Sequence, residues 1–327
     1  DGSRETLRGD LVVDASGRRS KLADWLEAIG VARPREESEP CGIFYSSRFY
    51  RIRPGAKRPE LPNGMGADLG YLKIGLFPGD GDIFSLTLAA SPEDPELRAV
   101  LRTRGFEAAV SALPMTSPWV APETAEPISD VHGMANLRNT RRWLVEDGEP
   151  LALGIAAIGD AQIHTNPIVG RGCSLAWVSA FLLAEALKAE PEDLRALALR
   201  YDAAVEREIV PWYKGQLAMD RDAIEVQEMH KRGEDPFKTD RPDGTQDPRA
   251  FTRALMRDGL GHAMRDDVKV LRAFMRVLNL LDPPEDVLQR PEVLQSVLRA
   301  WQDRGNRPPL VSGPSRREML DLLRPAA

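Results

Sequence analysis

The sequence has 327 residues, of which 42% are hydrophobic and 29% charged, as is typical of a globular protein with a substantial core. A formal net charge of -6, with only local arginine-rich runs, argues against a nucleic-acid partner, which requires a basic surface. The two cysteines, Cys41 and Cys173, exclude a disulfide framework and favour a cytoplasmic location.

The first predicted elements are a strand and a helix. Residues 10–17 form a short apolar, β-branched run closed by a glycine, which predicts a buried strand of a parallel sheet. A helix is predicted over residues 20–29, with Gly30 placed to end it. The apolar residues of this helix share one predicted face: Leu22, Trp25, Leu26 and Ile29.

From residue 41 the apolar positions alternate, which predicts an antiparallel meander. Its expected strands cover residues 43–53, 71–77 and 83–89, and a Gly- and Asp-containing turn joins the last two. Two short helices are predicted after the meander, over residues 95–103 and 105–113. Residues 114–127 are rich in proline and are expected to be irregular.

The second half of the chain returns to the parallel-sheet pattern. Residues 151–160 read as another buried strand, followed by a glycine-containing loop and a helix to about residue 187. No run approaches the roughly 18 uninterrupted apolar residues of a membrane span. Residues 173–187 are therefore predicted as a buried core helix that includes Trp177 and Phe181. From residue 210 onward the chain is predicted to be mostly helical.

One segment combines features that suit a ligand. The strand ends in a carboxylate, Asp160, and a loop with Pro167, Gly170 and Gly172 leads into the next helix. A helix N-terminus presents unpaired N–H groups and a partial positive charge, and glycines let the backbone approach a ligand closely. A carboxylate at the C-terminal end of a parallel strand is placed to bond ribose-like hydroxyls. Without a ligand, the same residues describe a strand end followed by a helix-initiating turn.

The segment resembles the Gly-Asp motif of the aromatic-hydroxylase family of FAD-dependent oxidoreductases. The matching residues are Gly159, Asp160, Ala161, Pro167, Gly170, Gly172 and Ala176. The resemblance implies that Asp160 holds the ribityl chain of FAD and that Pro167 lies beside the isoalloxazine ring. It also implies that the backbone of Gly170, Arg171 and Gly172 faces the pyrimidine edge of the ring. Where the family commonly has an aspartate on the following helix, this chain has Ser179.

A second motif supports the first. Residues 10–20 resemble the Asp-Gly motif of the same family, which implies that Ser16 and Gly17 contribute to FAD binding near the pyrophosphate. Ser16 replaces the usual aspartate, a form similar to that of the flavin halogenase and geranylgeranyl reductase branches. The family uses this motif in nicotinamide docking too, so NAD(P)H is the candidate electron donor, although the serine departs from the hydroxylase pattern.

The resemblance implies an α+β fold in four segments. Residues 1–40 and 136–209 would form an FAD-binding lobe, residues 41–135 an inserted antiparallel-sheet substrate lobe, and residues 210–327 a helical C-terminal extension. The Gly-x-Gly-x-x-Gly sequence that begins the family does not occur in these residues, and residues 1–6 read as a hairpin tip. We therefore expect a truncated chain that lacks its N-terminal dinucleotide-binding unit.

The implied activity is that of a flavin monooxygenase, which oxygenates a small organic substrate through a flavin C4a-hydroperoxide. Two alternatives stay open: a flavin-dependent reductase or dehydrogenase, and a truncated, non-catalytic scaffold with a vestigial flavin site. His164 is either an acid–base residue or, as we favour, a hydrogen-bonded structural histidine. The histidines show no metal-ligand spacing, so no metal is expected, and the sequence assigns neither a catalytic residue nor an oligomeric state.

Overall fold

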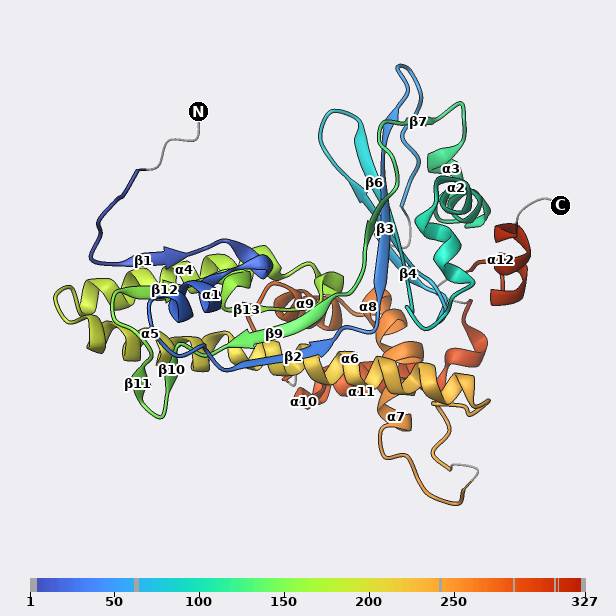
Figure 1. Ribbon diagram of the computed structural model, residues 1–327. Helices are drawn as coiled ribbons and strands as arrows, with labels where there is room; N and C mark the ends of the chain where they lie inside the picture. Colours follow the sequence, from blue (N-terminus) through green and yellow to red (C-terminus); the bar gives the residue numbers. More distant parts are fainter. Residues whose placement is uncertain are drawn as a thin grey trace. The chain divides into compact units, whose positions relative to one another are not determined.

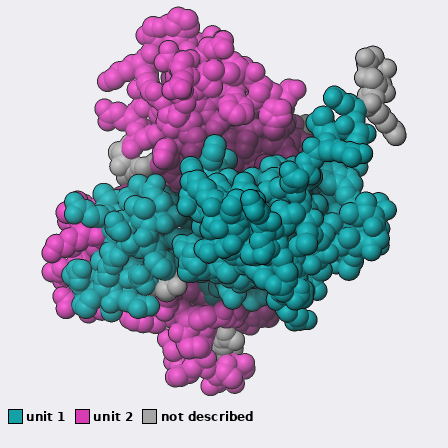
Figure 2. Space-filling view, turned by 90° about the vertical axis from the view of Figure 1, so that its left-hand side faces the viewer, with its two compact units in different colours: residues 1–41, 138–222, 271–294 teal, residues 42–137, 223–270, 295–327 magenta. Residues whose placement is uncertain are grey.

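The computed structural model describes residues 5–61, 65–240, 243–284, 286–308, 310 and 312–324. Residues 1–4 of the predicted hairpin tip lie outside this range. The chain divides into two compact units, coloured separately in Figure 2. Unit 1 comprises residues 1–41, 138–222 and 271–294, and unit 2 comprises residues 42–137, 223–270 and 295–327. Helices and sheets are both extensive, which confirms the α+β class.

Unit 1 contains short strands and long helices (Figure 1). Its first segment holds β1 (Val12–Asp14), the 3-10 helix η1 (Gly17–Arg19), α1 (Leu22–Ala28) and β2 (Glu36–Pro40). Its second holds β9 (Arg138–Arg142), β10 (Val145–Glu146), β11 (Glu149–Pro150), β12 (Ile155–Ala157), η3 (Gly159–Ala161), β13 (Ile163–His164), η4 (Pro167–Val169), α4 (Gly172–Ala189), α5 (Leu194–Glu208) and the start of α6 (Val210–Lys231). Its third holds most of α9 (Val268–Leu278), α10 (Asp286–Gln289) and the start of α11 (Pro291–Gln302).

The two predicted parallel strands pair with each other. β1 runs parallel to β12, with Val12 opposite Ile155 and Asp14 opposite Ala157, and Figure 1 shows the two strands side by side. The prediction that the first strand is buried is wrong for Val12 and Val13, which are 58% and 40% exposed. Within the described residues these strands form a two-stranded sheet, so β1 has a partner on one edge only.

The first helix is shorter than predicted and buries a narrower face. In α1, Leu22 and Leu26 pack with Ala157 and Ala161 in a small apolar cluster. Trp25 and Ile29 were expected on the same face but are 52% and 72% exposed. The buried residues of α1, Leu22 and Leu26, are four positions apart, and Ile29 lies beyond the end of the helix as its C-cap.

α4 is not the fully buried helix that its composition predicts. Its buried residues lie on one face at helical spacing: Leu175, Ser179, Leu183 and Ala186. Trp177 and Phe181 project from the opposite face and are 68% and 66% exposed, which corrects their assignment to the core. By length and composition α4 could cross a membrane, with 22% of the tested window buried, although core helices pass the same test. The absence of a membrane span stays a prediction.

The strands that were not predicted include β2 and β9, which lack apolar alternation. β2 pairs antiparallel with β9, which in turn pairs with β13. The facing residues Glu36 and Arg142 form an ion pair at 2.8 Å across the strands. Cross-strand charge pairs of this kind supply the pairing preference that hydrophobic patterning supplies elsewhere.

Unit 2 contains the predicted antiparallel sheet, in the strand order β4-β5-β6-β3-β7 with β8 also paired to β3. Its strands are β3 (Phe44–Ile52), β4 (Gly66–Asp68), β5 (Lys73–Pro78), β6 (Ile83–Ala90), β7 (Ala125–Pro127) and β8 (His132–Met134). Its helices are η2 (Leu97–Leu101), α2 (Thr103–Ala112), α3 (Ser117–Val120), the end of α6, α7 (Ala250–Ala254), the π-helix η5 (Leu255–Leu260), α8 (Gly261–Asp266), the end of α11, η6 (Arg304–Asn306) and α12 (Arg316–Leu323).

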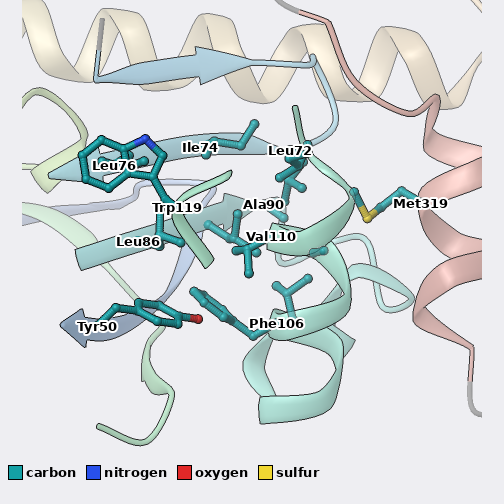
Figure 3. Close-up of a cluster of buried hydrophobic side chains, with 14 of the residues drawn as sticks. Tyr50, Leu72, Ile74, Leu76, Leu86, Ala90, Phe106, Val110, Trp119 and Met319 are labelled. Carbon is teal, nitrogen blue, oxygen red and sulfur yellow. The ribbon is translucent and has the colours of Figure 1, made fainter. Parts of the chain in front are cut away.

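The core of unit 2 lies between the sheet and α2. Figure 3 shows Phe106 and Val110 of α2 facing strand residues such as Leu86, with Met319 of α12 nearby. The fully buried Tyr50 stacks on Phe84, with ring centroids 5.2 Å apart. Helices therefore cover one face of the sheet, as the alternating pattern of apolar residues predicts.

The predicted four-segment division treats residues 210–327 as one helical extension. The structure distributes these residues over both units, because α6 passes from unit 1 to unit 2 at residue 222 and residues 271–294 return to unit 1. Residues 41–135 fall in unit 2 except for residue 41, and residues 1–40 in unit 1.

Candidate functional site

Asp160 occupies the position that the sequence assigns to a ligand contact. It lies in η3, directly after β12, at the C-terminal end of a parallel strand. Its side chain is half-buried and makes no hydrogen bond or ion pair with any residue that the structure describes. A carboxylate held this way keeps its oxygen lone pairs available for the hydroxyl groups of a ligand.

Gly159 explains how the Asp160 turn is fixed to α4. Its φ is +57°, and a Cβ built there would lie 2.8 Å from the Cβ of Ala176. The N–H of Gly159 donates to the Ser179 hydroxyl at 2.9 Å, and that hydroxyl donates to the Ala176 carbonyl at 2.8 Å. Ser179 therefore joins η3 to α4 through its hydroxyl group.

The loop between β13 and α4 leaves its middle exposed. Asn166 caps η4, because its side-chain oxygen accepts the N–H of Ile168 at 3.1 Å. Gly170 has a φ of +69°, and its N–H donates to the Pro167 carbonyl at 2.9 Å. Pro167, Gly170 and Gly172 are exposed, and a Cβ built on either glycine would meet nothing within 4 Å. The backbone here borders open space that a side chain would fill.

This open backbone leads into the N-terminus of α4. The helix begins at Gly172 and runs for 18 residues, and its N-cap residue, Arg171, makes no side-chain capping bond. The first N–H groups of an α-helix have no partner within the helix, and the helix dipole places a partial positive charge on them. The site therefore offers a negatively polarised group both N–H donors and a favourable field.

The Arg171 side chain points away from the opening. Its guanidinium lies 5.1 Å from the ring centroid of Trp212 and donates to the Gln216 side-chain oxygen at 3.3 Å. The residue is 9% exposed, and burial lowers the pKa of its guanidinium. Only the backbone of Arg171 is left for a ligand.

The Ser16 and Gly17 pair lies at the same edge of the sheet as Asp160, because η1 packs against η3. The N–H and the hydroxyl of Ser16 donate to Asp14 Oδ1 at 2.9 and 2.6 Å, and the Ser20 hydroxyl donates to Asp14 Oδ2. Burial opposes ionisation, yet the hydrogen bonds from Ser16 and Ser20 lower the pKa of Asp14. Sequence reasoning gave Asp14 no role. The available signal was its position two residues before Ser16 and six before Ser20, whose hydroxyl groups reach its carboxylate.

His164 lies on β13, half-buried, with its Nδ1 atom bonded to none of the described residues. The expectation of a hydrogen-bonded histidine is wrong for this nitrogen. Burial lowers the pKa of His164, and the Asp160 charge opposes the shift. In the described part of the chain, no group of three or more His, Cys, Asp or Glu residues could hold a metal ion.

No protein-family model matches the sequence. The protein Rv3254 of Mycobacterium tuberculosis is 27% identical over 326 residues, covering 94% of this chain and 62% of the relative. The chain thus spans less than two thirds of the length of that curated relative.

Among solved structures, the chain is similar to the FAD-dependent chondrochloren halogenase CndH of a myxobacterium. The TM-score is 0.49 and the identity 16%, over 96% of this chain and 60% of the other. It is also similar to HpxO of Klebsiella pneumoniae, solved with FAD and uric acid, with a TM-score of 0.45 and 16% identity over 89% and 60% of the two chains. A third similar structure is the anhydrotetracycline hydroxylase OxyS of Streptomyces rimosus, with a TM-score of 0.48 and 15% identity over 83% of this chain and 46% of the other.

Proposed function

We propose that this chain is the flavin-ring-binding part of an FAD-dependent oxidoreductase, a monooxygenase that acts on a small organic substrate. One observation carries the proposal: the half-buried Asp160 carboxylate has no partner among the described residues and lies at the end of a parallel strand, ahead of an open glycine loop. Such a carboxylate has oxygens free to accept hydrogen bonds, so a polyhydroxylated ligand suits it.

The residues present fit a flavin. The ribityl chain carries hydroxyls that would donate to Asp160. The flat ring needs a surface without side chains, which Gly170 and Gly172 offer, and the exposed Pro167 adds an apolar contact. Reduced flavin carries negative charge at its pyrimidine edge, which the N-terminus of α4 would stabilise.

Bound FAD would supply the redox chemistry, with NAD(P)H as the proposed electron donor and dioxygen as the oxygen source. The chain would contribute binding and orientation. Asp160 would fix the ribityl chain, and the 167–172 backbone would fix the ring. His164, with its lowered pKa, would stay neutral near pH 7 and would add no positive charge beside Asp160.

The first test is a titration of FAD with the purified chain, following the quenching of flavin fluorescence. We expect Asp160→Ala to weaken FAD binding by about 10- to 100-fold, because hydrogen bonds to a charged group are each worth about 1.5–3 kcal/mol. The matched control is Glu192→Ala, which removes an exposed carboxylate from the same unit and should leave the affinity unchanged.

If Asp160→Ala and wild type bind FAD with equal affinity, Asp160 does not contact the flavin. The absence of binding by every variant, wild type included, would refute a flavin site in this chain. If FAD binds, consumption of dioxygen coupled to substrate oxygenation would support the monooxygenase, whereas turnover without oxygen would favour the reductase.

A further inference from the structure

Three residues on one face of α6 carry a buried polar network outside both sequence motifs. Trp212, Gln216 and Asp220 are spaced by four residues and are 9%, 1% and 5% exposed. Positions i, i+4 and i+8 of a helix follow one another along a single face. This face presents an aromatic ring, an amide and a carboxylate to the rest of unit 1.

The Asp220 carboxylate accepts hydrogen bonds from several elements. Its Oδ1 accepts from the Asn166 side-chain amide at 3.0 Å and from that of Gln216 at 2.9 Å, while its Oδ2 accepts from the Asn139 amide at 2.7 Å. The Cys41 thiol adds a further hydrogen bond, and burial raises the pKa of this thiol to about 12. Burial also raises the pKa of Asp220, against the lowering effect of these donors.

Both ends of the candidate flavin loop are tied to this helix face. At the first end, Asn166 bonds Asp220 through its amide and Asn139 through its backbone N–H, at 2.7 Å. At the second end, the Arg171 guanidinium bonds Gln216 and lies over the Trp212 ring. Between the two ends, residues 167–170 are exposed or half-buried, so their conformation depends on the anchors.

We propose that Asp220 is a positioning residue for this loop, holding residues 166–171 in the conformation that presents their open backbone to the flavin ring. The inference rests on the proposed function. Asp220 acts through Asn166 and Gln216 and does not touch the flavin itself. Without these anchors, the loop around Gly170 would lose conformational entropy when the flavin binds, which weakens binding. An anchored loop has already lost this entropy on folding.

The test compares Asp220→Ala and Asn166→Ala with wild type and with the control Lys214→Ala, which alters an exposed residue of the same helix. The first readout needs no flavin: hydrogen exchange of the Ile168 and Gly170 amides, whose acceptors are Asn166 Oδ1 and the Pro167 carbonyl. The second is the FAD dissociation constant. We expect both test variants to exchange these amides about tenfold faster or more and to bind FAD correspondingly more weakly. Lys214→Ala should match wild type in both.

A double variant separates positioning from general damage. If Asp220 acts through Asn166, Asp220→Ala and Asn166→Ala together should weaken FAD binding by less than the product of the single effects. Amides of α5 report the folding of unit 1. If amides throughout unit 1 exchange faster in Asp220→Ala, the Gly170 amide in Asn166→Ala decides the matter, because Asn166→Ala itself removes the acceptor of the Ile168 N–H.

Unchanged exchange at Ile168 and Gly170 in the folded variants would overturn the anchoring. Faster exchange with an unchanged FAD dissociation constant would overturn the positioning role alone. If the wild-type protein binds no FAD, the proposed function is refuted. Faster exchange in the variants would then show that the network is purely structural, which also overturns the positioning role.

Discussion

Two carboxylates at one edge of the β1–β12 sheet differ in their surroundings and therefore in their roles. Asp14 is 6% exposed and accepts hydrogen bonds from Ser16 and Ser20, so its oxygens are already used to hold the turn after β1. Asp160 is half-buried and has no such partner in the described chain. The first is suited to stabilising the fold and the second to binding.

The pKa of Asp14 leads to a pH-dependent prediction. Because its folded-state pKa is lowered below the unfolded value of about 3.9, the ionised Asp14 stabilises the fold above that pH, and this contribution is lost as the pH falls through the folded-state pKa. Ser16→Ala removes one stabilising donor and should lower the free energy of unfolding at pH 7 by about 1–2 kcal/mol. The deficit should shrink at pH 3, as urea unfolding at both pH values would measure.

Ser174→Ala is the control, since Ser174 is an exposed serine in the same unit, and it should be neutral at both pH values. A deficit of Ser16→Ala that stays the same at pH 3 and pH 7 would contradict a role for the Asp14 charge.

At the scale of elements, α4 depends on two glycines for different reasons. Gly159 has a positive φ and also lies against Ala176, so both its backbone and its lack of a side chain are required. Gly170 has a positive φ but borders open space. The first glycine serves packing between η3 and α4, while the second serves the conformation of the loop.

Matched alanine variants should separate the two requirements. Gly170→Ala should lower the free energy of unfolding by about 1–2 kcal/mol, the cost of a left-handed conformation. Gly159→Ala should lower it by about 1–3 kcal/mol more, because its Cβ would also overpack against Ala176. Chemical denaturation of both variants measures the difference. Equal losses of unfolding free energy would mean that α4 can move away from the added Cβ at position 159 without an energetic cost.

At the scale of the whole molecule, each unit has an apolar core of its own. In unit 1 the cluster joins α4, α5 and the first turns of α6 with β12 and β13. In unit 2 it joins the antiparallel sheet with α2, α3 and α12. The candidate flavin residues all belong to unit 1, whose segments are separated in the sequence by the sheet of unit 2.

The core of unit 2 can be tested with two phenylalanines. Phe106→Ala empties a fully buried position and should lower the free energy of unfolding by about 3–5 kcal/mol. Phe77→Ala removes a ring that is 49% exposed and should cost about 1 kcal/mol or less. Urea unfolding followed by near-UV circular dichroism distinguishes them, and similar losses would show that burial in this core does not control stability.

Local patterns were sufficient to predict the main elements. The strand before Ser16, the helix ended by Gly30, the meander and the helix after Gly172 all lie within about three residues of their predicted bounds. Asp160 and the loop glycines were proposed as ligand contacts from the sequence, because a strand end, a carboxylate and glycines at short spacing form a local signal, and this role stays a prediction.

Only the tertiary structure decided which residues are buried and which polar groups meet. The sequence cannot show that Trp177 and Phe181 are exposed, because composition does not state what covers a helix face. Nor can it pair Asp220 with Asn139 and Asn166, which are 81 and 54 residues away along the chain. Hydrogen bonds over such separations depend on how strands and helices pack, whereas propensities and turn signals act over a few residues.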